Sequence, residues 1–322
     1  LLLDGNDRQG LPFLNGGTVS VRSSGDIDVR QGSLIDVSSG AAVMADGKTR
    51  GGKGGDLTLT ASTGASSGNG ALNLDGELRG TGVNGGGTLT LAASKVLIGN
   101  SGSPLEPGTL QLGGDFFDKG FSAYDITGNQ GLTVAEGTQV DVTMPVYRFG
   151  EQALSTGSDA EPADALQRWT PALYQEDEIN GVMTQRRGAS LSVTAGTANS
   201  SAADMASTVL KLGKGSVISV DPGQGIDVRS IGQLAANGTL TACGGRVSLT
   251  GLSVIGTEGE AVNAQGHGRS IWLGEQALID VSSRAVTAQD MRGQTYGLVR
   301  DGGQIVIGGQ IDAAKGSASA SE

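Results

Sequence analysis

The sequence has few of the side chains on which disulfide-bonded domains and histidine-dependent enzymes rely. It holds one cysteine, Cys243, and one histidine, His267, among 322 residues. A single cysteine excludes an intramolecular disulfide and a cysteine-based zinc cluster. Ser-His-Asp or Cys-His catalysis would have to use His267, which we expect to be a polar turn residue. The sequence therefore predicts no catalytic residue and no enzyme activity.

Basic residues and long apolar runs are also scarce. The net charge is −11, with 22 Lys and Arg against 33 Asp and Glu. Proteins that bind nucleic acid through its phosphates need a basic surface, so we expect no nucleic-acid partner. No run of 18 or more apolar residues occurs, and no transmembrane segment is expected. Because the chain begins Leu1-Leu2-Leu3-Asp4 rather than with Met, we expect residues 1–322 to be one segment of a longer protein.

Aromatic residues and proline are rare, whereas glycine is abundant. Aromatics make up 3% of the chain and proline supplies 7 residues, against 56 glycines. Low proline and the absence of a three-residue glycine period exclude collagen and a Pro/Gly-rich disordered chain. This composition favours many tight turns and a core of thin aliphatic layers.

Short apolar–x–apolar triplets recur at a step of eight residues. Ile27-Asp28-Val29 follows Val19-Ser20-Val21 by this step, and Ile35-Asp36-Val37 follows in turn. The same step links triplets starting at Leu132 and Val140, Leu210 and Ile218, and Ile271 and Ile279; a six-residue step links those at Ile305 and Ile311. Alternation with period two is the signature of a β-strand.

The spacing of the triplets predicts an all-β, right-handed parallel β-helix. Three strand residues and about five corner residues leave no room for crossover helices. Coils of roughly 20 residues give about a dozen coils, or a rod roughly 60 Å long at about 4.8 Å per coil. Glycine pairs are expected at the corners with positive φ, namely Gly16-Gly17, Gly54-Gly55, Gly86-Gly87, Gly244-Gly245 and Gly302-Gly303.

Three segments depart from the repeat. Residues 113–128 hold four of the eleven aromatics, which we expect to fill a wider coil or cover its flank. Residues 144–188 hold four more, and we interpret this segment as an excursion that packs back on the flank of the coils. A short helix capped by Asp159 is expected over 159–169. A weaker interruption at 284–301 is expected to be a loop.

Two patterns could bind calcium, but we expect no metal and no cofactor. Six aspartates stand between apolar neighbours (Asp28, Asp36, Asp141, Asp227, Asp280 and Asp312). A ladder of such carboxylates could hold calcium, but their irregular intervals favour solvated charges that prevent lateral aggregation. Residues 51–59 are similar to a calcium-binding nonapeptide, yet they occur once and carry Thr58 where a large apolar residue is needed.

The excursion at 144–188 is the best candidate for contact with a partner, because functional surfaces tend to lie on loops carried by a rigid scaffold. It contains four aromatic side chains and an acidic run. The predicted contact residues are Tyr147, Phe149, Trp169, Tyr174, Glu176, Asp177 and Glu178.

Several of these stretches resemble a known family. Gly-Gly-Thr-Val-Ser-Val at 16–21, Gly-Ser-Leu-Ile-Asp-Val-Ser-Ser at 32–39 and the glycine-rich stretch 302–313 resemble the degenerate repeats of filamentous-haemagglutinin-like exoproteins, the passengers of bacterial two-partner secretion. The aromatic stretch 116–124, followed by Gly131-Leu132-Thr133-Val134, resembles a region in the C-terminal parts of some of them.

The resemblance implies a secreted β-helical shaft at the bacterial cell surface. Such proteins cross the outer membrane through a partner pore that engages an N-terminal domain, which is not visible in this sequence. They then serve in adhesion, aggregation or presentation of a distal toxin, with a receptor or glycan on a host or neighbouring cell as partner.

Two alternatives remain open. The first is a carbohydrate-active β-helix enzyme, which three or more charged side chains converging in a groove beside a coil would favour. His267 stands in a Gly-His-Gly-Arg stretch that is similar to a pectin-hydrolase motif, but the clustered aspartates of such enzymes are missing. The second is a sugar-binding module that uses Tyr147, Trp169 and Tyr174.

Overall fold

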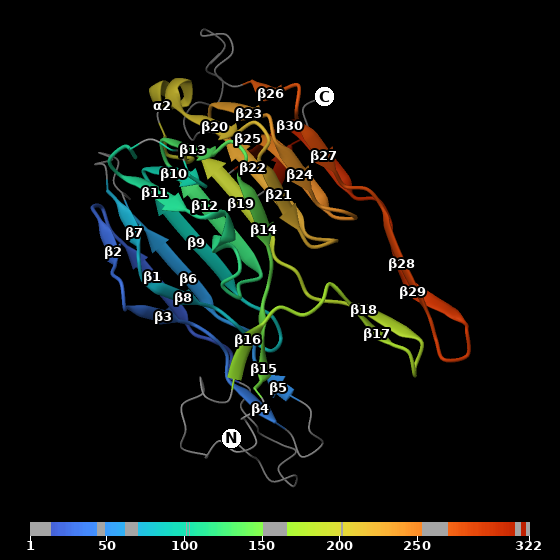
Figure 1. Ribbon diagram of the computed structural model, residues 1–322. Coiled ribbons are helices and arrows are strands. Elements are labelled where there is room, and N and C mark those ends of the chain that lie inside the picture. Colours follow the sequence, from blue (N-terminus) through green and yellow to red (C-terminus); the bar gives the residue numbers. More distant parts are fainter. Residues whose placement is uncertain are drawn as a thin grey trace.

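The protein is built almost entirely of β-strands. The computed structural model describes residues 14–43, 49–61, 70–100, 102, 104–150, 166–200, 202–252, 270–312 and 317–319. Within these ranges one α-helix, α2 (Ala202–Ser207), and one 3-10 helix, η1 (Gly114–Phe116), accompany the strands (Figure 1). No helix in the described part is long and apolar enough to cross a membrane.

The largest sheet has nine strands, which follow one another in sequence order. They are β1 (Thr18–Arg22), β6 (Asp56–Thr60), β9 (Thr88–Ala93), β12 (Ala123–Gly128), β19 (Ser190–Ala195), β22 (Gly225–Ser230), β25 (Arg246–Leu252), β30 (Gln304–Asp312) and β31 (Ser317–Ser319). Neighbouring strands are parallel except β31, which pairs antiparallel with β30.

The other parallel strands form a six-stranded sheet, a four-stranded sheet and two pairs. The six-stranded sheet has the order β11 (Thr109–Leu112), β10 (Lys95–Ile98), β13 (Gly131–Val134), β20 (Val209–Leu212), β23 (Gln233–Ala236), β26 (Ile271–Leu273). The four-stranded sheet consists of β14 (Gln139–Val142), β21 (Val217–Val220), β24 (Thr239–Thr241) and β27 (Leu278–Asp280). The pairs are β2 (Ile27–Val29) with β7 (Leu72–Leu74), and β3 (Leu34–Asp36) with β8 (Glu77–Arg79).

Consecutive strands of the chain enter these sheets in turn. β19, β20 and β21 lie in the nine-, six- and four-stranded sheets, and β22, β23 and β24 repeat the order, as do β25, β26 and β27. We call each such set of consecutive strands a layer. The predicted eight-residue step from Leu210 to Ile218 therefore joins strands of neighbouring sheets, whereas Ile305 and Ile311 belong to one strand, β30, with no corner between them.

The stack is shorter than the sequence predicts. Because β31 is antiparallel, the nine-stranded sheet contains strands from eight layers in the described part, fewer than the predicted dozen coils. Eight layers span roughly 34 Å at about 4.8 Å per step. The steps from Ile226 to Val247, from Leu210 to Leu234 and from Val217 to Thr239 approach the expected coil length, while the step from Tyr124 to Leu191 includes a long excursion.

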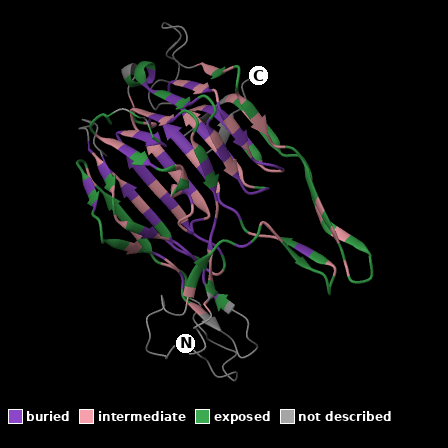
Figure 2. Ribbon diagram, in the orientation of Figure 1, coloured by how far each residue is buried: buried purple, intermediate pink, exposed green. Residues whose placement is uncertain are grey.

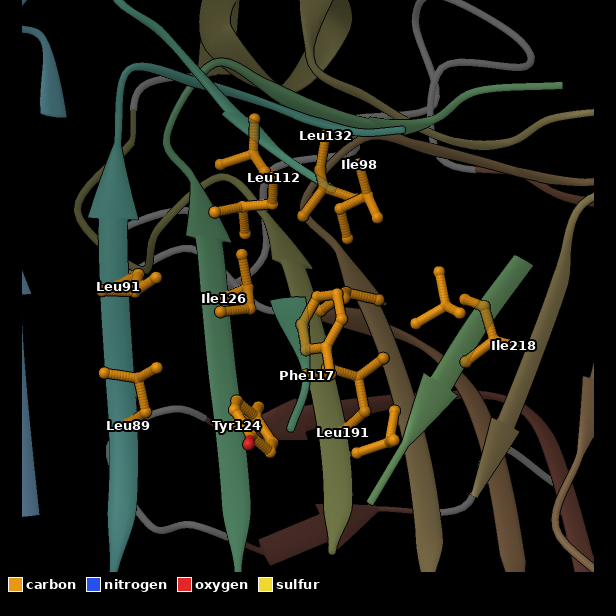
Figure 3. Packing of buried hydrophobic residues seen from close by; sticks show 14 of the residues in the cluster. Leu89, Leu91, Ile98, Leu112, Phe117, Tyr124, Ile126, Leu132, Leu191 and Ile218 are labelled. Atoms are coloured by element: carbon orange, nitrogen blue, oxygen red, sulfur yellow. The ribbon is translucent and has the colours of Figure 1, made fainter. Parts of the chain in front are cut away.

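The core consists of columns of aliphatic side chains that run across the layers. Leu89, Tyr124 and Leu191 are register partners in β9, β12 and β19, and all are buried (Figure 3). Leu91 and Ile126 begin a parallel column, and purple buried positions alternate with paler ones along the strands (Figure 2). This alternation is expected for strands with one face on a core.

The apolar–Asp–apolar triplets point as predicted. Ile27 and Val29 are buried on either side of exposed Asp28, and Val140 and Val142 flank exposed Asp141 in the same way. Asp36 is also exposed, and Asp227 and Asp280 are half-buried with their apolar neighbours turned toward the core. The side chain of Asp312 lies outside the described residues.

The glycine pairs are explained by crowding between layers rather than by positive φ. Of the ten glycines in these pairs only Gly244 has a positive φ, of 57°. A Cβ on Gly55 would lie 1.8 Å from the carbonyl oxygen of Gly17, and one on Gly87 would lie 2.2 Å from that of Gly55. Successive backbones thus approach too closely for a side chain, which corrects the prediction from corner geometry.

The aromatic segment 113–128 is only partly an interruption of the strands. Residues 123–128 form β12 in the middle of the nine-stranded sheet, whereas η1 and a loop precede it. Phe117, Phe121 and Tyr124 are buried in the core and meet edge to face, at centroid distances of 5.4 and 6.1 Å. Three of the four aromatic side chains thus lie in the interior, whereas Phe116 is half-buried beside them.

Four antiparallel hairpins lie outside the parallel sheets. We name β15 (Val146–Phe149) with β16 (Leu166–Trp169) the first hairpin, β17 (Tyr174–Asp177) with β18 (Val182–Gln185) the second, and β28 (Arg284–Gln289) with β29 (Thr295–Arg300) the third. The fourth joins β4 (Ala41–Val43) and β5 (Thr49–Gly51).

The hairpins revise two sequence predictions. The described end of the helix expected over 159–169 is strand β16, because Leu166–Trp169 pair with β15. The loop expected at 284–301 is the third hairpin, whose turn is ordered by Asp290, which accepts hydrogen bonds from the backbone N–H groups of Arg292 and Gln294. Figure 1 shows the second and third hairpins projecting from the stacked sheets on the same side.

Candidate functional site

A groove of about 800 Å³ lies between the outer face of β3 and β8 and the first hairpin. Its floor consists of four outward side chains: Leu34 and Glu77 are register partners, as are Asp36 and Arg79. The intervening partners Ile35 and Leu78 face the core. The parallel pairing of residues 34–36 with residues 77–79 therefore brings the carboxylates of Asp36 and Glu77 close to the guanidinium of Arg79.

The first hairpin supplies one wall of the groove through Tyr147, Leu166 and Arg168. Tyr147 in β15 and Arg168 in β16 are cross-strand partners, so their side chains share one face of the hairpin. The Tyr147 hydroxyl donates a hydrogen bond to Ser38 Oγ at 3.3 Å, which joins the hairpin to the end of β3.

Hydroxyl side chains and backbone close one end of the groove. The Ser38 N–H donates to Asp36 Oδ1 at 2.8 Å, and Ser38 Oγ accepts from the Thr81 N–H at 3.2 Å. Ser39 also lines the groove, and it is 7% exposed. Its Oγ has no hydrogen-bond partner among the described residues, which is costly for a buried hydroxyl.

The two guanidinium groups of the groove are held differently. Arg79 binds Glu77 through two parallel hydrogen bonds, Nε to Oε1 and Nη2 to Oε2, both 2.7 Å. These bonds hold the pKa of Glu77 below its usual value, and the charges of Arg168 and Lys119 act in the same direction. Arg168 is held less closely among the described residues, by an ion pair of 3.6 Å with Asp118 Oδ2 and a hydrogen bond of 3.5 Å to the Asp118 carbonyl oxygen.

The residues predicted from the sequence do not form one site. Of the six whose side chains the structure describes, only Tyr147 lines the groove. Trp169 lies on the other face of the first hairpin, where the guanidinium of Arg148 stacks 5.2 Å from its ring centroid. Phe149 belongs to β15, but its side chain lies outside the described residues.

The remaining predicted residues lie on the second hairpin. Tyr174, Glu176 and Asp177 belong to β17, and Glu178 begins the turn. Asp177 accepts hydrogen bonds from the side chain and backbone N–H groups of Asn180 at 2.7 and 3.0 Å, which lower its pKa. This hairpin contacts the third one through β18 and β29.

The described residues show how one other candidate motif is used. No group of three or more His, Cys, Asp or Glu in the described part could hold a metal ion. Asp56, in the nonapeptide-like segment, instead accepts a hydrogen bond from the Thr88 N–H at 2.8 Å. His267 lies outside the described residues.

Glu77, Arg79 and Arg168 were not predicted from the sequence as site residues. Asp36 is exposed, as predicted, and lies on the floor of the groove. The alternation Glu77-Leu78-Arg79 marks a strand with two opposite charges on its outer face, and this signal is present in the sequence. The pairing of that strand with residues 34–36 is set by the register of β3 and β8, which the triplets alone do not specify.

The fold and the groove define an all-β protein of stacked parallel sheets with a polar, partly aromatic groove on its flank. No family model, no curated protein and no solved structure matches the chain.

Proposed function

We propose that the chain is a right-handed parallel β-helix that serves as a non-enzymatic structural and adhesive shaft segment of a large, secreted, surface-associated bacterial exoprotein. Its role is to adhere, to aggregate cells or to present a distal effector. Its partners are an outer-membrane secretion pore, engaged through a region outside this sequence, and a receptor or glycan on another cell.

The repeated entry of consecutive strands into the same three sheets is the observation that carries this proposal. Each layer hydrogen-bonds to the next through parallel strands, as in a solenoid. Parallel connections of this kind are nearly always right-handed. A stack with a continuous aliphatic core resists bending, which suits a protein that holds other regions away from a cell.

Labelling of the producing bacterium tests the proposed location and role. Antibodies against residues 1–322 are expected to stain intact cells or to recover the protein from the medium. Deletion of the outer-membrane pore is expected to abolish this signal, and deletion of residues 1–322 in frame is expected to reduce attachment to other cells. Protein confined to the cytoplasm in pore-positive cells would contradict the proposal.

Carbohydrate binding is a second candidate function, and the groove favours it. Asp36, Glu77, Arg79 and Arg168 converge there beside Tyr147. Clefts with apolar walls and a few fixed polar groups are typical ligand sites. Binding fits better than hydrolysis, because a glycosidase needs a carboxylic acid with a raised pKa, whereas the pKa of Glu77 is lowered by Arg79.

A glycan array tests this second candidate. The wild-type protein is expected to give hits that weaken in Tyr147→Ala and persist in Tyr174→Ala, because Tyr174 lies on the second hairpin. An array without hits, or equal signals from both variants, would contradict sugar binding in the groove.

A further inference from the structure

The groove contains one guanidinium whose donors are not taken up by close protein contacts. Arg79 is engaged by Glu77 through its Nε and Nη2 groups. The Arg168 side chain is 43% exposed, and its contacts with Asp118 exceed 3.4 Å. A guanidinium presents five N–H donors in a planar fork that matches a carboxylate. Arg168 therefore keeps a long ion pair with Asp118 and has further N–H donors for an anionic ligand group.

We propose that the groove binds an acidic saccharide and that Arg168 receives its carboxylate. This inference rests on the second candidate function, carbohydrate binding, and names its ligand class. A uronic acid combines the features that the groove offers partners for: a carboxylate, several hydroxyls and a ring with an apolar face.

The charges of the groove suit such a ligand although the whole protein is acidic. The net charge of the chain is −11, yet the groove lining carries two carboxylates and two guanidiniums. The positive charges of Arg168 and Lys119 act on Glu77 in addition to its Arg79 partner. An anionic group thus meets a local surface that is far less acidic than the rest of the molecule.

The other lining residues suit the sugar ring and its hydroxyls. Leu34, Leu166 and Tyr147 supply apolar surface around the groove. Asp36 supplies a carboxylate acceptor for hydroxyl groups. Ser39, buried with no hydrogen-bond partner for its Oγ in the described part of the chain, offers a donor and acceptor that a ligand hydroxyl would satisfy.

Titration calorimetry with matched pairs of oligosaccharides tests the inference. Each pair consists of a uronic acid trimer and the neutral hexose trimer of the same linkage, with galacturonate, glucuronate and mannuronate members. Hydrogen bonds to a charged group are stronger than neutral ones by a margin that corresponds to about a tenfold change in affinity or more. At least one acidic trimer is therefore expected to bind ten times more tightly than its neutral counterpart.

Two variants assign the effect to Arg168. Arg168→Gln is expected to remove the tenfold preference by lowering the affinity for the acidic trimer to about that for the neutral one. Arg148→Gln is the matched control, because Arg148 lies on the same hairpin but stacks on Trp169; it is expected to keep the preference. Circular dichroism of both variants checks that they are folded.

The outcomes separate the inference from the function on which it rests. Equal binding of acidic and neutral trimers, or a preference that survives in Arg168→Gln, would refute the acidic ligand and leave carbohydrate binding intact. Absence of binding by every trimer would refute both. A preference lost in Arg168→Gln alone would support both.

Discussion

The stacked sheets and the hairpins are built from strands of similar length, but they differ in the packing of their side chains. Strands in the stack carry buried side chains that meet register partners above and below, as Ile126 meets Leu91 and Val193. The second hairpin instead exposes most of its side chains, including Ile179 in its turn, which is 85% exposed. The stack therefore gives stability, and the hairpins contribute little to it.

The groove lies where these two regions meet. Its floor belongs to β3 and β8 of the stack, and its wall belongs to the first hairpin. The floor of the groove is rigid, whereas the sequence of the hairpin wall can change without loss of the core. Binding residues are often found on loops that a rigid scaffold holds in this way.

Truncation of one buried side chain in a core column should cause the largest loss of stability. Leu191→Ala removes a buried side chain between Tyr124 and Ile226, and we expect it to lower the free energy of unfolding by about 2–5 kcal/mol. Urea denaturation measures this loss. Val182→Ala, at an exposed position of the second hairpin, is the control and should cost less than about 0.5 kcal/mol. Equal losses would erase the distinction between the two regions.

Adding a methyl group between layers should be the next largest effect. Gly55→Ala would place its Cβ 1.8 Å from the Gly17 carbonyl oxygen, and we expect a loss of about 1–3 kcal/mol as the layers shift. Gly17→Ala is the matched control, because a Cβ there meets no atom within 4 Å. It should change the free energy of unfolding by less than about 1 kcal/mol. If thermal denaturation gives the same midpoint for both variants, close approach of the layers is not the reason for the glycine pairs.

The Glu77–Arg79 pair should make a small, pH-dependent contribution. Because the folded protein lowers the pKa of Glu77, the contribution is complete above the ordinary carboxyl value of about 4.3 and is lost as the pH falls through the lowered value. Solvent screening of the half-exposed Glu77 limits it to about 0.2–1 kcal/mol. Urea denaturation at pH 7 and pH 3 measures how much the free energy of unfolding falls between these two pH values. Arg79→Gln should make this fall smaller by the contribution of the pair, whereas Arg148→Gln should leave it unchanged.

A polar substitution in the hairpin turn should have the smallest effect. Ile179→Ser is expected to change the free energy of unfolding by less than about 0.5 kcal/mol, because this side chain is already exposed. The same substitution at Ile126 should cost about 3 kcal/mol or more, because it leaves a void and buries a hydroxyl. A large loss at Ile179 would mean that the hairpin supports the stack.

The sequence predicted which side chains of the strands face inward better than it predicted the number of layers. Alternation around Asp28 and Asp141 was sufficient to assign inward and outward faces, because a strand with one buried face has a period of two. The number of layers could not be predicted in this way. The register partners Val19 and Leu57 lie 38 residues apart (57 − 19) and Leu57 and Leu89 lie 32 apart (89 − 57), well above the roughly 20 residues that the triplet spacing predicts.

The groove was harder to predict than the fold, because it joins three distant parts of the chain. The aromatic content of the 144–188 excursion led to Tyr147, which does line the groove. It led equally to Trp169, which faces the other side of the same hairpin and stacks on Arg148. Which face of a two-stranded hairpin turns toward the stack depends on tertiary packing, and local sequence does not determine it.

Hydrogen exchange measured by mass spectrometry tests the central claim most directly, since it reports the opening free energy of each segment. The account predicts that amides of β12, β19, β22 and β25 exchange only by global unfolding, together and slowly. Amides of the second and third hairpins are predicted to exchange faster by orders of magnitude at the same pH. Uniform protection of both regions, or faster exchange in β12 and β19 than in the second hairpin, would contradict the division of the molecule into a stable stack and independent hairpins.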